Sequence, residues 1–172
     1  MLVPIFFACD EKFVKFTMVA IRSIIANASA ENTYKIHILH MGISEPTQKK
    51  ATDMATENVD IEFVDVTENM NKIRAKLPIR DYYTATTYYR LFIPEMYPEY
   101  RKALYIDSDT VALKDVAELY AVSLGKTYAG VCPDRVVAQT DILGDYTEKV
   151  LGVSRSSYFN AGIMLMNCKQ FR

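Results

Sequence analysis

The chain has 172 residues, half of them apolar, with 20 basic and 21 acidic residues and two histidines. Its length predicts one domain, 1–172, with enough apolar residues for a sizeable core. A net charge of −1 and scattered basic residues argue against a nucleic-acid partner, and no apolar run reaches the roughly 18 residues of a membrane span. Three widely separated cysteines favour buried, reduced thiols in a cytoplasmic protein.

Strands and helices alternate in the first half of the chain. Residues 2–8 form an apolar strand, and apolar side chains at helical spacing predict a helix over about 12–28. The elements expected next are a strand at 34–40, a helix from 44 to about 58, a strand at 61–66 and a short helix around 68–75. This alternation predicts βαβ units, hence an α/β fold with a mostly parallel sheet and helices on both faces.

The second half is less regular, as expected where a binding site is built on loops. A helix at 84–96 should stop near the prolines that close it. The elements expected after it are strands at 103–106 and 128–131, a helix at 139–151 and a last strand at 163–166.

The most informative motif is Asp107-Ser108-Asp109, which follows the apolar strand at 103–106. Because side chains alternate along a strand, we expect the two aspartates to face one side and Ser108 the other. Two carboxylates so placed suit Mg²⁺ or Mn²⁺, with phosphate oxygens completing the coordination. The alternative is a solvated turn or a helix N-cap.

A second candidate lies where the first strand ends, at Ala8-Cys9-Asp10. Asp10 can accept a hydrogen bond from a base or a ribose hydroxyl there, or it can simply cap the following helix. The chain has no Gly-x-Gly-x-x-Gly and no Gly-Lys-Ser/Thr sequence, so dinucleotide binding is disfavoured and a P-loop is excluded.

Two further segments carry polar groups in apolar surroundings. Arg90 lies among aromatic and apolar residues and needs a carboxylate or phosphate partner, or else forms a structural salt bridge. Asn160 offers an amide to sugar hydroxyls, and Gly162 allows close approach of the backbone. The alternative for this second segment is a polar turn into a strand.

In order, these segments resemble the nucleotide-sugar glycosyltransferases of family 8, which include bacterial lipopolysaccharide galactosyl- and glucosyltransferases and the glycogenins. The resemblance covers essentially the whole chain. It rests on Phe7–Asp10, His37–Leu39 with Gly42–Ser44, Thr86–Leu91, Leu104–Asp109 and Tyr158–Asn167.

The resemblance implies a GT-A fold that transfers hexose from UDP-glucose or UDP-galactose with retention of configuration. Asp107 and Asp109 would bind Mn²⁺ (or Mg²⁺), and Arg90, Asn160 and Ala161 would bind substrate. The nucleotide would be held by Ala8, Cys9, Asp10, Glu11, Lys12, Phe13, Tyr83, Asp107 and Ser108. Lys12 departs from the small polar residue often found at its position.

The acceptor implied is a bacterial surface glycan or a lipid-linked one, and the place of action is the cytoplasm, with peripheral contact at the inner face of the membrane. The family's further segments, which carry a histidine as third metal ligand, a lysine for the diphosphate and the polar pair near the reacting sugar, are not in this sequence. His37 and His40 are expected to be packed or edge residues instead. We therefore weigh a hexosyltransferase against a UDP-sugar-binding module with little transfer activity, or a fragment that binds no ligand.

Overall fold

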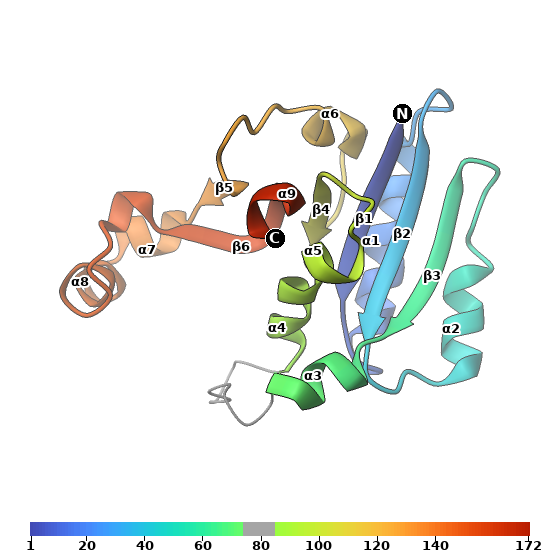
Figure 1. Ribbon diagram of the computed structural model, residues 1–172, viewed down its shortest axis with the longest axis horizontal. Coiled ribbons are helices and arrows are strands. Elements are labelled where there is room, and N and C mark those ends of the chain that lie inside the picture. Colours follow the sequence, from blue (N-terminus) through green and yellow to red (C-terminus); the bar gives the residue numbers. More distant parts are fainter. Residues whose placement is uncertain (74–84) are drawn as a thin grey trace.

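The computed structural model describes residues 1–73 and 85–172, and within them six strands form one sheet (Figure 1). The strands are β1 (Leu2–Ala8), β2 (Thr33–His40), β3 (Val59–Asp65), β4 (Ala103–Ile106), β5 (Ala129–Pro133) and β6 (Phe159–Met166). Their order in the sheet is β3-β2-β1-β4-β6-β5. All six expected strands are present, so the sequence pattern placed the sheet-forming segments correctly.

The sheet is parallel in its first four strands and antiparallel beyond them. β1 pairs in parallel with both β2 and β4, and β2 pairs in parallel with β3. β6 runs antiparallel to β4 and to β5. The mostly parallel α/β architecture expected from the alternation of strands and helices is confirmed.

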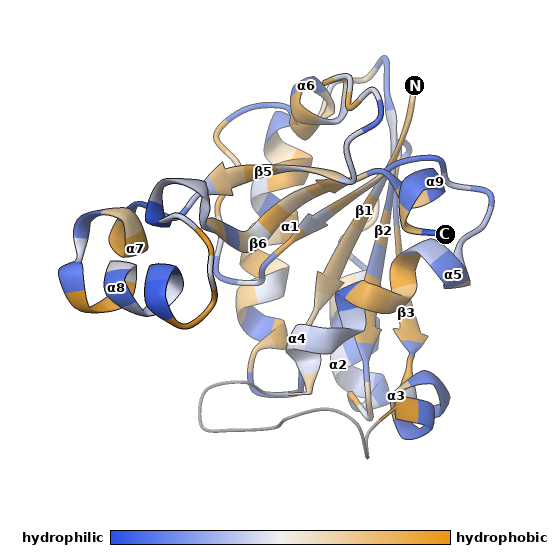
Figure 2. Ribbon diagram, turned by 60° about the vertical axis from the view of Figure 1, so that its left-hand side comes forward, coloured by the Kyte–Doolittle hydropathy of each residue, from blue (hydrophilic) through white to orange (hydrophobic). Residues whose placement is uncertain are grey.

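Helices cover both faces of the sheet, as predicted (Figures 1 and 2). Residues of α1 (Val14–Asn27), α2 (Glu45–Thr52) and α6 (Val116–Tyr120) pack on one face. Residues of α3 (Thr67–Ile73), α4 (Thr86–Tyr89), η2 (Arg90–Phe92), α5 (Ile93–Met96) and α9 (Cys168–Phe171) pack on the other. The remaining elements, α7 (Arg135–Gln139), α8 (Asp141–Lys149) and η3 (Arg155–Ser157), lie at the far end of β5 and β6.

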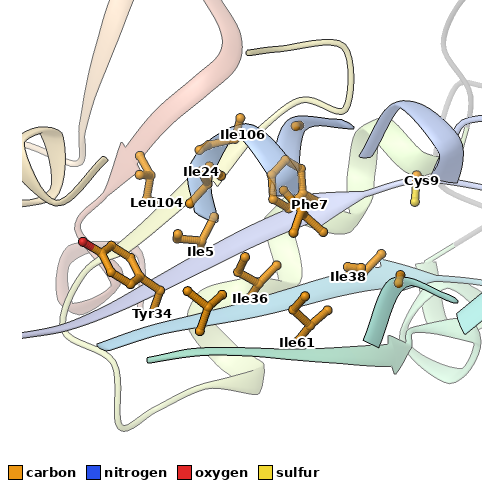
Figure 3. Close-up of a cluster of buried hydrophobic side chains, with 14 of the residues drawn as sticks. Ile5, Phe7, Cys9, Ile24, Tyr34, Ile36, Ile38, Ile61, Leu104 and Ile106 are labelled. Atoms are coloured by element: carbon orange, nitrogen blue, oxygen red, sulfur yellow. The ribbon is translucent and has the colours of Figure 1, made fainter. Parts of the chain in front are cut away.

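The alternation of side chains along β1 builds both cores. Ile5 and Phe7 belong to the cluster under α1, whereas Phe6 belongs to the cluster on the opposite face. Figure 3 shows the first cluster, in which Ile36 and Ile38 of β2 join Ile5 and Phe7. Apolar side chains on both faces of the central strands are what a sheet covered on both sides requires.

Three helices differ from their expected bounds. The helix expected over 44–58 ends at Thr52, because residues 53–58 form the turn into β3, where Thr56 bridges Val59. The helix expected over 84–96 is broken into α4, η2 and α5, and residue 84 lies outside the described residues. The helix expected over 139–151 is α8, which is two residues shorter at each end, and an unpredicted helix, α7, precedes it and is capped by Asp134 through hydrogen bonds from Val136 N and Val137 N.

The structure tests the predicted burial of the cysteines and histidines. Cys9 and Cys168 are buried, but Cys132 is exposed, which corrects the prediction that all three thiols are buried. It lies at the β-bulge of β5, where the strand leaves regular register with β6.

His37 and His40 are buried in β2, which confirms that they are packed residues. Among the described residues, no helix is long and apolar enough to cross a membrane.

Candidate functional site

The sequence-predicted candidates gather at a cleft of about 230 Å³ beyond the carboxyl ends of β1 and β4. Its lining residues are Ala8, Cys9, Asp10, Phe13, Thr86, Thr87, Arg90, Tyr105, Asp107, Ser108 and Asp109. The chain winds from β1 to β2 and β3 on one side, and β4 then adds on the other side of β1. The cleft therefore lies at the point where the strand order reverses, the usual ligand site of an open α/β sheet.

Asp107 is held by groups from three elements. Its Oδ1 accepts hydrogen bonds from the hydroxyl of Tyr105 at 2.8 Å and from Nη2 of Arg90 at 3.2 Å. Its backbone N–H donates to the carbonyl of Gly162 in β6 at 2.7 Å. The carboxylate is therefore oriented before any ligand arrives.

Arg90 is nearly buried, and each nitrogen of its guanidinium group donates a hydrogen bond within the protein. Nε donates to the Thr87 carbonyl at 3.0 Å, and Nη1 donates to the Ala161 carbonyl. The guanidinium carbon lies 4.1 Å from the centre of the Tyr105 ring, a cation–π contact. Arg90 thus forms the structural salt bridge that was one of its two interpretations, and it also lines the cleft where an anionic ligand would lie.

Asp109 and Ser108 lie in the turn after β4, because the strand ends at Ile106. The Thr110 hydroxyl closes the turn by donating to the Asp107 carbonyl at 2.9 Å. The exposed Asp109 carboxylate makes no side-chain hydrogen bond with any residue that the structure describes. Ser108 is buried and accepts a hydrogen bond from the Thr17 hydroxyl of α1 at 2.8 Å. It therefore points toward the helix and away from Asp107, as the alternation of side chains predicted.

In the loop after β1, some residues line the cleft and others hold the fold together. Oδ1 of Asp10 accepts from the backbone N–H groups of Lys12 and Phe13, both at 2.9 Å, so it holds the turn before α1; the N-cap of α1 is Phe13, which corrects the capping interpretation of Asp10. Glu11 turns away to the start of α2, where it accepts from the Ser44 N–H at 2.8 Å. Neither Glu11 nor Lys12 is among the residues that line the cleft. Burial raises the pKa of the Cys9 thiol to about 11, so this cleft residue stays neutral.

Asn160 and Ala161 lie on β6, beside the cleft but not in its lining. Ala161 contributes its backbone carbonyl to Arg90, and Asn160 accepts from the Gly162 N–H at 2.7 Å. A Cβ atom at Gly162 would lie only 2.7 Å from Oδ2 of Asp107, so glycine is needed for this approach. Tyr83 lies outside the described residues.

The sequence interpretation missed Tyr105, Thr86 and Thr87, which the structure adds to the cleft. A signal for Tyr105 was present, because a residue two positions before Asp107 on a strand points to the same face. A signal for Thr87 was present too, because it lies three residues before Arg90 and residues three apart in a helix share a face.

The donor set suits a hard divalent cation. Asp107 and Asp109 both line the cleft and offer carboxylate oxygens, the ligand type that Mn²⁺ and Mg²⁺ prefer. Within the described ranges 1–73 and 85–172, the cleft included, no cluster of three or more His, Cys, Asp or Glu side chains could hold a metal ion. Two carboxylates make a weak site alone, so other ligands would have to complete the coordination.

Sequence comparison agrees with this arrangement. A family model described as glycosyl transferase family 8 matches residues 4–172. A Haemophilus influenzae protein provisionally named as a glycosyltransferase is 28% identical over 169 residues, which are 98% of this chain and 49% of that protein. The chain thus spans about half the length of the curated relative that it matches.

Solved structures show the same relationship. The apo structure of the bifunctional glycosyltransferase WbbM superposes with a TM-score of 0.83 at 30% identity, covering 98% of this chain and 32% of WbbM. The galactosyltransferase LgtC, in complex with donor and acceptor sugar analogues, superposes with a TM-score of 0.80 at 28% identity, covering all of this chain and 59% of LgtC. These neighbours have GT-A type folds, which confirms the predicted fold class. The chain therefore belongs to glycosyltransferase family 8.

Proposed function

We propose that the chain binds the nucleotide-sugar donor of a metal-dependent hexosyltransferase that retains anomeric configuration. The donor would be UDP-glucose or UDP-galactose, and the acceptor a bacterial surface glycan or lipopolysaccharide. The observation that carries the proposal is the meeting of Asp107, Asp109 and Arg90 at one cleft, at the reversal of strand order, in a family 8 chain.

The walls of the cleft suggest how the donor would lie. Ala8, Asp10 and Phe13 at the end of β1 would contact the uridine, with Phe13 offering an aromatic face and Asp10 its free carboxylate oxygen. Arg90 would contact the diphosphate or the donor sugar. Asn160 and Ala161 would contact the donor sugar. Arg90 is suited to an anion because its guanidinium presents several fixed donors.

Asp107 and Asp109 would hold Mn²⁺ or Mg²⁺ together with diphosphate oxygens. Such an ion, when bound, neutralises the charge that develops on the departing UDP. The protein's part is to orient the two carboxylates, and Asp107 is already oriented by hydrogen bonds to Tyr105 and Arg90.

We propose that the protein acts in the cytoplasm. If its acceptor is lipid-linked, it would act at the inner face of the membrane. The three free cysteines support a reducing compartment.

A second candidate, a UDP-sugar-binding module with little transfer activity, is favoured by one observation. Among the described residues, no third His, Cys, Asp or Glu side chain joins Asp107 and Asp109 in a cluster that could hold a metal ion. Release of UDP from UDP-glucose or UDP-galactose in the presence of Mn²⁺ separates the two candidates, because the module should bind the donor without releasing UDP.

We predict that Mn²⁺ strengthens UDP binding and that Asp109→Ala abolishes this strengthening, because Asp109 supplies half of the protein's oxygen ligands. Isothermal titration calorimetry with UDP, in Mn²⁺ and in EDTA, measures the effect. Asp60→Ala removes an exposed carboxylate of β3 and should leave the Mn²⁺ effect intact. The same Mn²⁺ effect in Asp109→Ala as in the wild type would refute the metal assignment.

A further inference from the structure

Tyr105 makes contacts that go beyond filling the core. It is 1% exposed and lies on β4, two residues before Asp107. Its hydroxyl donates to Oδ1 of Asp107 at 2.8 Å, and its ring lies against the Arg90 guanidinium. One side chain therefore contacts both charged residues on this wall of the cleft.

The two oxygens of the Asp107 carboxylate have different surroundings. Oδ1 accepts from both Tyr105 and Arg90, whereas Oδ2 accepts no hydrogen bond from any residue in the described part of the chain. Oδ2 occupies space left by the missing side chain of Gly162, where a Cβ atom would come within 2.7 Å of it. Rotation of the carboxylate would break the hydrogen bonds that Oδ1 accepts from Tyr105 and Arg90.

We propose that Tyr105 is a positioning residue that orients the Asp107 carboxylate so that Oδ2 stays available for a divalent cation. The inference rests on the proposed metal-dependent binding of UDP. Residues that hydrogen-bond to a metal ligand and orient it normally contribute to metal affinity. Their loss typically weakens the affinity for the metal about 10–100-fold. Tyr105 would act through Asp107 and not by touching the nucleotide.

The competing explanation is purely structural, because a buried phenol hydroxyl needs a partner wherever it lies. The chain provides a matched case. Tyr34 is fully buried, and its hydroxyl donates to the Asp115 carboxylate at 2.7 Å. Neither Tyr34 nor Asp115 lines the cleft, so this pair has the same chemistry without the proposed role.

The test compares Tyr105→Phe with Tyr34→Phe. Both variants lose a hydrogen bond from a buried hydroxyl to a carboxylate, and Tyr34→Phe also removes the acceptor of the Ser29 N–H and the Asn32 amide, so urea unfolding should show at least as large a loss of stability in Tyr34→Phe. Calorimetry with UDP should show the Mn²⁺-dependent strengthening reduced about tenfold or more in Tyr105→Phe and unchanged in Tyr34→Phe. UDP affinity in EDTA should be the same in both variants, because the proposed role concerns only the cation.

A second variant disturbs the same carboxylate from the opposite side and does not depend on the stability of Tyr105→Phe. Gly162→Ala would place a methyl group against Oδ2 of Asp107 and should also reduce the Mn²⁺ effect. An unchanged Mn²⁺ effect in Tyr105→Phe, alongside a wild type that shows one, would overturn the positioning role alone. A wild type that binds UDP equally with and without Mn²⁺ would overturn the proposed function together with this inference.

Discussion

At the end of β1, the Asp10 carboxylate holds the turn that leads into α1. Its Oδ1 accepts from two backbone N–H groups, and the same residue lines the cleft. The turn uses one carboxylate oxygen of Asp10 and leaves the other to a ligand, so the structural role of Asp10 is compatible with the proposed functional one.

We predict that Asp10→Ala weakens UDP binding and lowers the free energy of unfolding by only about 1 kcal/mol, the usual scale of a lost cap. Asp10→Asn keeps an oxygen for the turn and should recover most of the stability but less of the binding. Urea unfolding and calorimetry with UDP on the same samples measure both effects. Normal UDP affinity in folded Asp10→Ala would leave the turn before α1 as the only role of this residue.

Among the elements, strand β2 buries two histidines, His37 and His40. Nδ1–H of His37 donates to the Glu62 carboxylate at 2.6 Å, and the His37 ring stacks on Phe6 with ring centres 4.4 Å apart. Nδ1 of His40 accepts from the N–H groups of Gly42 and Ile43 at 3.2 and 3.1 Å. Burial lowers the pKa of both histidines, against the opposing effect of the nearby carboxylates.

These lowered pKa values predict that acid destabilises the fold. The unfolded histidines bind protons near their ordinary pKa of about 6.5, whereas the folded ones bind them only at lower pH. The free energy of unfolding should therefore fall as pH drops from about 7.5 to 5.5, with a slope of up to about 1.4 kcal/mol per pH unit for each histidine. Urea unfolding at several pH values measures the slope.

His40→Gln provides the control, because glutamine does not titrate. Protonation of His40 at Nδ1 would remove the acceptor that Gly42 and Ile43 use, so the variant should have a shallower slope even if it is less stable at pH 7.5. The carboxylates with lowered pKa values, such as Asp65 and Asp115, titrate below this pH range and should not contribute. An identical slope in His40→Gln would mean that His40 does not carry the effect.

At the scale of the whole molecule, two apolar clusters on opposite faces of one sheet hold the chain together. Figure 2 shows the apolar strands between helices that turn polar residues outward. Helices α7 and α8 extend from the antiparallel end of the sheet, and several of their apolar side chains are exposed. Stability should therefore depend on the central strands and little on that end.

We predict that Ile36→Ala lowers the free energy of unfolding by about 2–5 kcal/mol, because Ile36 is fully buried in β2 and its loss leaves a cavity. The matched Ile142→Ala change removes the same atoms from a side chain that is 82% exposed on α8 and should cost no more than about 0.5 kcal/mol. Urea unfolding followed by circular dichroism compares them. Similar losses in the two variants would show that the α7–α8 end is part of the cooperative core.

Local pattern alone predicted the strands, the first helix and the acidic motif at a strand end. Strand periodicity and apolar runs are properties of neighbouring residues, so β1 to β4 could be placed without knowing what they pack against. The helix predicted at 139–151 is present as α8, but α7 was missed, because a helix of five residues that starts at the Asp134 cap gives little periodic signal.

Only the tertiary structure decided which of these residues meet. Asp10 and Asp107 are almost a hundred residues apart, and they share a cleft because β4 adds beside β1 instead of beside β3. That strand order depends on packing and on the chain crossing the sheet, which no local pattern encodes. The same holds for Tyr105, Arg90 and Gly162 around Asp107, and for Glu11, which the fold turned toward α2 and away from the cleft. The sequence by itself determined the chemistry available at each strand end, and the packing of the sheet determined which of those groups act together.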